Sequence, residues 1–182
     1  MSGQRLFIAI DLPDELARRF ALLDPKYRGL IFTLPEQIHL TLAFFPHVEA
    51  ASTAALRERL IAISFRAFFL PLTGLGTFSQ RGQPHVLWAG VGNAHPHLFQ
   101  LHKRVNEAAL ACRLPIDERA WTPHITIARA RGISAALMKS FLKQHRDFDA
   151  GMFRVDAFHL YESTLTPAGP VHRRDLTIPA TT

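Results

Sequence analysis

Two short stretches of this sequence carry residue types that can move protons and bind phosphate. They are His39-Leu40-Thr41-Leu42 and His124-Ile125-Thr126-Ile127, two copies of the pattern His-x-Thr-x. Side chains alternate between the two faces of a β-strand, so each copy places its imidazole and hydroxyl on one face and its aliphatic pair on the other. We therefore expect each copy to lie on a strand that buries the aliphatic pair and turns the histidine and threonine toward a cleft.

Two imidazoles that face each other suit a reaction in which one proton is removed and another is delivered. A general base activates a water and a general acid protonates the leaving oxygen, and each contributes about 10²–10⁴-fold. The hydroxyls of Thr41 and Thr126 can donate hydrogen bonds to the oxygens of a phosphate held between them. Arg129 follows the second motif and offers a charged, planar fork for the same oxygens. Strict alternation puts Arg129 on the face opposite His124 unless the strand ends before it.

Each of these residues also has a plainer explanation. A histidine or threonine on an amphipathic strand is commonly a surface or packing residue, and Arg129 could be a solvated charge at a strand end. Trp88 and Tyr161 are candidates for stacking on a nucleic-acid base, with core packing an equal alternative. The other eight histidines, including the close pair His95 and His97, are expected to be surface or packing residues, and we expect no metal site.

The segments around the motifs show the periodicities of strands and helices. Apolar runs and turn residues predict extended segments over residues 5–11, 38–45, 67–78, 85–91, 121–128, 153–162 and 174–178. Helical spacing predicts helices over residues 13–23, 52–64, 96–111 and 134–144, with Ser52 and Ser134 as N-caps. Pro46 is expected to end the strand of the first motif.

The order of these elements repeats along the chain. Strand, helix, strand, helix, strand occurs over about residues 5–78 and again over about 85–163, and the two motifs stand 85 residues apart. We therefore predict an α+β fold with one domain over residues 1–182, in which a duplicated unit forms two lobes. Two antiparallel-type sheets flanked by helices would then enclose a central cleft that carries both motifs.

The composition suits a folded, basic protein of a reducing compartment. Hydrophobic residues make up 48% of the chain and charged residues 20%, which excludes disorder as the main state. The single cysteine, Cys112, excludes a disulfide-stapled scaffold. The net charge of +6 favours anionic partners such as nucleic acid or nucleotides. Without a signal-peptide pattern or an apolar run of about 20 residues, we expect a cytoplasmic monomer with no membrane partner.

The two motifs and the segments around them resemble those of the two-histidine (2H) phosphoesterase superfamily. The resemblance rests on RLFIAID from Arg5, HLTLAFF from His39, TPHITIAR from Thr122 and LYES from Leu160, and it runs from Arg5 to about residue 178. These segments look like the bacterial and archaeal RNA 2′,3′-cyclic phosphodiesterases, historically called 2′-5′ RNA ligases. One departure is Pro46-His47, where relatives commonly have glycine, and this alters the loop that leaves the first motif.

This resemblance implies a bilobal α+β fold, no metal or other cofactor, and hydrolysis of a 2′,3′-cyclic phosphate on RNA ends or nucleotides to a 2′-phosphate. It implies His39 as the proton donor, His124 as the proton acceptor, and Thr41, Thr126 and Arg129 as ligands of the phosphate. Alternatives are a relative that acts on another cyclic phosphate or on a 2′-5′ linkage, including reversible RNA ligation, and a nucleotide-binding module without turnover. The intact pair of histidines favours the enzyme.

Overall fold

The structure is a computed structural model that describes residues 3–117, 119–167 and 169–181. The elements in this part of the chain are, in order, β1 (Gln4–Asp11), α1 (Asp14–Ala21), β2 (Leu30–Phe32), the 3₁₀ helix η1 (Pro35–Gln37), β3 (His39–Val48), α2 (Ala50–Ile61), β4 (Phe68–Thr73), β5 (Leu75–Gln80), β6 (Gln83–Gly90), α3 (Pro96–Ala111), β7 (His124–Ala130), α4 (Ala135–Gln144), β8 (Asp149–Val155), β9 (Ala157–Thr166) and β10 (Gly169–Pro179). Within the described residues, no helix is long and apolar enough to cross a membrane.

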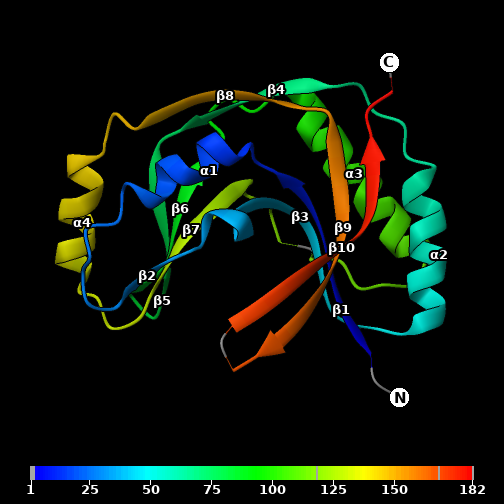
Figure 1. The fold of residues 1–182 in the computed structure, drawn as a ribbon, viewed down its shortest axis with the longest axis horizontal. Coiled ribbons are helices and arrows are strands. Elements are labelled where there is room, and N and C mark those ends of the chain that lie inside the picture. The colour runs from blue at the N-terminus through cyan, green and yellow to red at the C-terminus, as the bar shows by residue number, and fades with distance from the viewer. Residues whose placement is uncertain (1–2, 118, 168, 182) are drawn as a thin grey trace.

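The strands form two antiparallel sheets, and the α+β fold class is confirmed. The larger sheet has the order β10-β9-β1-β3-β7-β6-β5, with β2 beside β7, and the smaller sheet consists of β4 and β8. The motif-bearing strands β3 and β7 are neighbours at the centre of the larger sheet and, as far as the described residues go, pair only at Leu40 and Ile125. From this point the sheet divides into two wings (Figure 1).

Helices accompany each of the two wings. α2 and α3 pack on each other and on the wing of β10, β9, β1 and β3, whereas α1 and α4 lie with the other wing (Figure 1). β9 and β10 come late in the chain, but β9 pairs with β1 and β10 pairs with β9, so the wing that holds His39 contains strands from both halves of the sequence. The duplication of one unit along the sequence stays a prediction.

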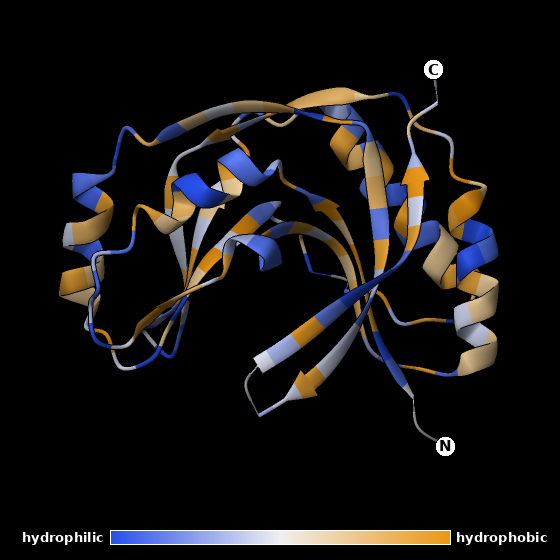
Figure 2. Cartoon of the chain, viewed as in Figure 1, coloured by the Kyte–Doolittle hydropathy of each residue, from blue (hydrophilic) through white to orange (hydrophobic). Residues whose placement is uncertain are grey.

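A hydrophobic core lies on the helix-facing side of the strands. Leu6, Ile8 and Ile10 alternate along β1 and are almost wholly buried. Figure 2 shows the matching change between apolar and polar residues along the strands. The motif residues Leu40 and Ile125 are fully buried in the same core. Because truncation of such a leucine to alanine costs about 2–5 kcal/mol, the core holds the backbone of both motifs in place.

The expected end of the first motif strand at Pro46 is wrong. β3 continues through Pro46 to Val48. The pairing between β1 and β3 is irregular between Phe45 and Val48. A position that does not contribute to the regular ladder can be occupied by proline, because no backbone N–H is needed there.

The expected N-cap of the second helix is also wrong, whereas that of the last helix is confirmed. α2 begins at Ala50, with Glu49 as its N-cap in an extended conformation, and not at Ser52. The two alanines before Ser52 are strong helix formers and extend the helix by a further half turn. At α4, the hydroxyl of Ser134 accepts a hydrogen bond from the backbone N–H of Leu137 at 3.2 Å, as a capping serine does.

Two segments predicted as single extended stretches are divided between the two sheets. Residues 67–78 form β4 and β5, with a break at Gly74, whose φ of +76° favours glycine. Residues 153–162 contribute to β8 and β9, and the chain changes sheet at Asp156. β10 is longer than the predicted strand over residues 174–178, and the three-residue β2 was not predicted.

Candidate active site

The two motifs come together where β3 meets β7. Because the centres of the two motifs lie opposite each other on antiparallel strands, His39 lies beside Thr126 and Thr41 lies beside His124. The four side chains point away from the core, so the structure brings two imidazoles and two hydroxyls to one small area, with the imidazoles on a diagonal.

A cleft of about 500 Å³ opens in front of these four residues. The β2–η1 segment and the tip of the β9–β10 hairpin line it, together with Arg129 of β7 and Arg131, which follows the end of β7. The side-chain amide of Gln37 donates a hydrogen bond to the carbonyl oxygen of Pro170 at 3.0 Å and ties the hairpin to η1. The volume lies within the range of about 300–1,000 Å³ that is usual for sites of small molecules and cofactors.

Both imidazoles are oriented by the same kind of backbone contact. Nδ1 of His39 lies 2.8 Å from the carbonyl oxygen of Gln37, and Nδ1 of His124 lies 2.8 Å from that of Thr122. A carbonyl oxygen can only accept a hydrogen bond, so each Nδ1 carries a proton. In each neutral ring, Nε2 is therefore the basic nitrogen that is left to exchange a proton with a substrate.

His39 is held more tightly than a surface histidine. Its ring stacks on Phe7, with centroids 4.8 Å apart and an angle of 26° between the planes. Burial lowers the pKa of His39 from 6.5 to about 4, although the hydrogen bond to Gln37 and the charge of Asp11 act in the opposite direction. The free protein therefore holds His39 neutral at pH 7.

Arg129 reaches the cleft because β7 contains a bulge. The pairing with β6 shifts there, so that Thr126 and Ala128 lie opposite consecutive residues of β6 and Ile127 is the extra residue. Ile127 and Ala128 are both fully buried, and Arg129, which follows them, is exposed and lines the cleft. An extra residue reverses the alternation beyond it. The strict alternation applied to the sequence, which places Arg129 on the opposite face, is wrong for this reason.

Trp88 lies on β6 beside β7, whereas Tyr161 lies on β9, which β1 separates from β3. Neither residue is among those that line the cleft. Trp88 packs over Gly76, and its ring centroid lies 6.5 Å from that of His124. One face of Tyr161 is stacked on Phe7 at 4.9 Å. These contacts are packing contacts beside the two motifs, and base stacking by either ring stays a prediction without support from the structure.

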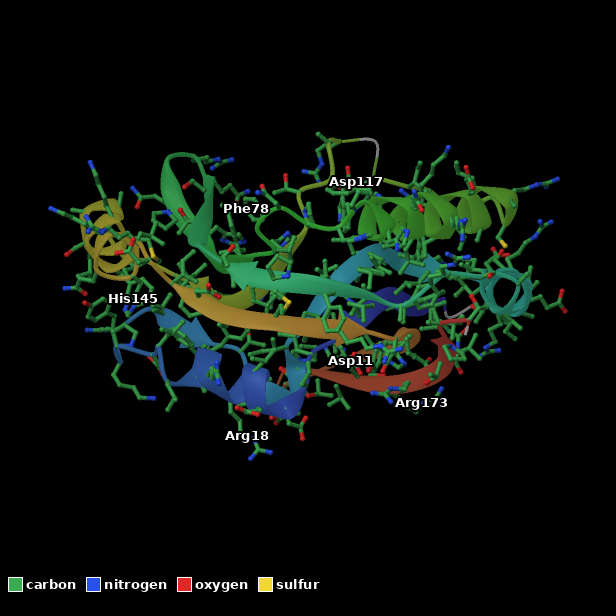
Figure 3. All side chains as sticks on the ribbon, turned by 90° about the horizontal axis from the view of Figure 1, so that it is seen from above. Asp11, Arg18, Phe78, Asp117, His145 and Arg173 are labelled. Atoms are coloured by element: carbon green, nitrogen blue, oxygen red, sulfur yellow. The ribbon has the colours of Figure 1, made fainter. Side chains whose placement is uncertain are left out.

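The hydroxyl of Tyr161 belongs to a polar network behind His39. It donates hydrogen bonds to both carboxylate oxygens of Asp11, at 2.9 and 2.7 Å, and Arg174 binds the same carboxylate. Burial and then the bond to Asp11 raise the pKa of Tyr161 to about 12. Figure 3 shows Asp11 near the middle of the molecule, whereas Arg18 and His145 lie at its periphery. The network fixes the strands β1, β9 and β10 behind the site.

Several residues that line the cleft were missed by the sequence reasoning. Ile31 and Leu34 lie on or beside β2, a strand too short to show a periodicity. Arg131 could have been found from its spacing of two residues from Arg129. His172 was assigned to the surface or packing class, but it lines the cleft beside His39.

The charges in the cleft come from arginine side chains. Arg129 lines it from β7, and Arg131 lines it from the residues that follow this strand. Over the described part of the chain, no three His, Cys, Asp or Glu side chains are grouped as metal ligands would be. Two imidazoles, two hydroxyls and two guanidinium groups around one cleft can bind an anionic phosphate and exchange protons on both sides of it.

Comparisons with known proteins agree with this geometry. The sequence profile of the 2′-5′ RNA ligase superfamily matches residues 12–166. A Methanocaldococcus jannaschii protein named RNA 2′,3′-cyclic phosphodiesterase is 30% identical over 172 residues, which cover 92% of this chain and 96% of the relative. The crystal structure of E. coli LigT in its apo form covers all of both chains with a TM-score of 0.82 and 25% identity. A solved structure from Thermus thermophilus, TT0787, covers 96% of this chain and 97% of its own, with a TM-score of 0.77 and 27% identity. This chain belongs to the 2′-5′ RNA ligase superfamily.

Proposed function

We propose that this protein hydrolyses the 2′,3′-cyclic phosphate of RNA ends or nucleotides to a 2′-phosphate without a metal ion. The observation that carries the proposal is the paired arrangement of His39 and His124, each with Nδ1 bound to a carbonyl and Nε2 left for the substrate. Relatives named RNA 2′,3′-cyclic phosphodiesterase support it. One chain supplies both motifs, so the proposal takes a monomer as the active form, and it places the reaction in the cytoplasm.

The reaction is an in-line displacement at phosphorus. Nε2 of His124 accepts a proton from a water molecule as the water oxygen forms its bond to phosphorus. The bond between phosphorus and O3′ breaks, and Nε2 of His39 donates its proton to O3′. The proton taken up at one imidazole balances the proton released at the other. Thr41, Thr126 and Arg129 bind the non-bridging oxygens, where negative charge increases in the transition state.

The low pKa of His39 is compatible with a role as the general acid only if the bound substrate raises this pKa. Burial lowers this pKa to about 4, so the free protein carries little of the imidazolium form at pH 7. A phosphate anion about 4 Å away contributes about 4 kcal/mol at an effective dielectric constant of 20. That energy raises a pKa by about 3, which offsets the effect of burial. Binding of the substrate thus supplies the proton-donating form of His39.

The cleft walls favour a nucleotide over a smaller cyclic phosphate. The side chains of Ile31 and Leu34 are 56% and 55% exposed, and both line the cleft. Pro167 and Pro170 line the cleft from the β9–β10 hairpin. These apolar surfaces suit the faces of a nucleobase whose phosphate lies between the two motifs.

Incubation with 2′,3′-cyclic AMP in EDTA, followed by chromatography, tests the proposed function. The wild-type protein is expected to turn over fully in EDTA. His39→Ala and His124→Ala should each lose at least about 100-fold in kcat, because each removes one proton-transfer partner. His47→Ala, an exposed histidine on the same strand as His39, serves as the control and should keep full activity. Either single variant within threefold of the wild type, or inhibition by EDTA that zinc or magnesium reverses, would contradict the proposal.

The identity of the product tests the direction of the reaction. The motifs are nearly symmetric, and the placement of His39 beside O3′ rests on the resemblance to the 2H phosphoesterases. Phosphorus NMR of the product from 2′,3′-cyclic AMP should show the 2′-phosphate. A predominant 3′-phosphate would exchange the acid and base roles of the two histidines while leaving paired catalysis intact.

A further inference from the structure

A third imidazole, that of His172, lies in the cleft next to His39. Its ring meets the ring of His39 edge-on, with centroids 5.9 Å apart and an angle of 89°, and it meets Phe7 at 4.8 Å and 74°. His172 lies on β10 opposite Ser163 of β9 and lines the cleft together with the two motifs. The proton transfers described above need only two imidazoles, so His172 is not used by them.

The surroundings of His172 decide which nitrogen carries its proton. Nδ1 is buried and, among the described residues, has no hydrogen-bond partner. The buried hydroxyl of Ser163 on the neighbouring strand is in the same situation. In proteins, a buried N–H without an acceptor is rarer than a buried acceptor atom without a donor. The proton of the neutral ring of His172 therefore belongs on Nε2, and Nδ1 keeps its lone pair. Nε2 lies at the far end of the ring from the backbone and is the nitrogen that can reach into the cleft.

His172 is neutral at pH 7. Burial lowers its pKa from 6.5, and the guanidinium group of Arg5 on β1 lowers it further. The two residues that follow His172 are arginines, and both form ion pairs with other residues: Arg173 binds Glu162 and Arg174 binds Asp11. His172 therefore offers the cleft a neutral N–H donor beside His39.

We propose that His172 is a substrate-binding residue whose Nε2–H donates a hydrogen bond to an oxygen of the terminal nucleotide on the His39 side of the phosphorus. The inference rests on the proposed function, in which this side holds the ribose that carries the leaving oxygen. It assigns to His172 a contact with the substrate and no proton transfer.

Three substitutions separate the hydrogen bond from the packing of the ring. His172→Phe keeps an aromatic ring against Phe7 and His39 but removes the donor. His172→Gln places an amide N–H near the position of Nε2, and His172→Asn places one near the position of Nδ1. His47→Phe is the matched control, because His47 is an exposed histidine on β3.

Steady-state kinetics with 2′,3′-cyclic AMP, with thermal melting of each variant, test the inference. His172→Phe should lose on the order of 10-fold in kcat/KM, which corresponds to 1.4 kcal/mol. His172→Gln should recover most of this loss, and His172→Asn should not. Wild-type kcat/KM in His172→Phe, or a failure of His172→Gln to exceed His172→Asn, would overturn the contact. If His172→Phe does not fold, the comparison of Gln with Asn still decides. A wild-type protein inert toward 2′,3′-cyclic AMP would instead refute the proposed function itself.

Discussion

The buried imidazole of His39 predicts a defined part of the destabilisation of this protein by acid. Burial lowers the pKa of His39 from 6.5 to about 4, whereas the unfolded chain keeps a value near 6.5. Between these values the unfolded state binds more protons, so the free energy of unfolding falls as the pH falls. From pH 7 to pH 4.5 the loss due to His39 amounts to about 2 kcal/mol, at 1.36 kcal/mol per unit of pKa difference.

Urea unfolding at pH 7 and at pH 4.5 measures this loss. His39→Asn removes the titrating group and keeps a donor near the position of Nδ1 for the carbonyl oxygen of Gln37. The wild-type protein should lose about 2 kcal/mol more than this variant between the two pH values, because the other titrating groups are common to both. His47→Asn, which changes an exposed histidine, should behave as the wild type. Equal losses in wild type and His39→Asn would show that His39 is not desolvated.

Three further predictions concern the ligands of the phosphate and the nucleobase. Thr41→Val and Thr126→Val keep the shape of the side chain but remove a hydrogen-bond donor, so kcat should fall by about 10- to 1000-fold in each variant. Full activity in either variant would exclude a contact between that threonine and the phosphate. Arg129→Lys should recover only part of the kcat/KM that Arg129→Ala loses, since lysine lacks the fork, and full activity in Arg129→Ala would place this residue outside the site. Leu34→Ser should raise KM for 2′,3′-cyclic AMP by about 5-fold while glycerol 1,2-cyclic phosphate, which has no base, is hydrolysed as before. Leu110→Ser, at an exposed leucine on α3, is the control for Leu34→Ser, and equal effects on both substrates would argue against a base contact.

The sequence was sufficient to predict the parts of this structure that depend on local pattern. The alternation within His39-Leu40-Thr41-Leu42 correctly separates a buried aliphatic pair from two polar side chains that line the cleft. The same alternation correctly predicts that the second motif buries Ile125 and Ile127 and leaves His124 and Thr126 on the other face. Strands and helices with a clear apolar period were found close to their observed positions because their buried faces are set by residues near in sequence.

The remaining features depend on contacts between distant strands. The bulge that turns Arg129 toward the cleft arises from the register of β7 against β6, which no local pattern records. β2 is too short for a period, and β10 is rich in polar residues. His172 joins the cleft only because β10 folds back beside β9 and brings it against Phe7 and His39. A list of histidines in the sequence therefore could not separate His172 from the others.

The central claim is that two imidazoles act together in one displacement, and the double variant tests it most directly. Single-turnover rates on 2′,3′-cyclic AMP in EDTA would be measured for His39→Ala, for His124→Ala and for the two changes combined. If both histidines serve the same transition state, the double variant should lose no more than about tenfold beyond the slower single variant, as groups that act as a unit do. Losses that multiply in the double variant would contradict paired catalysis.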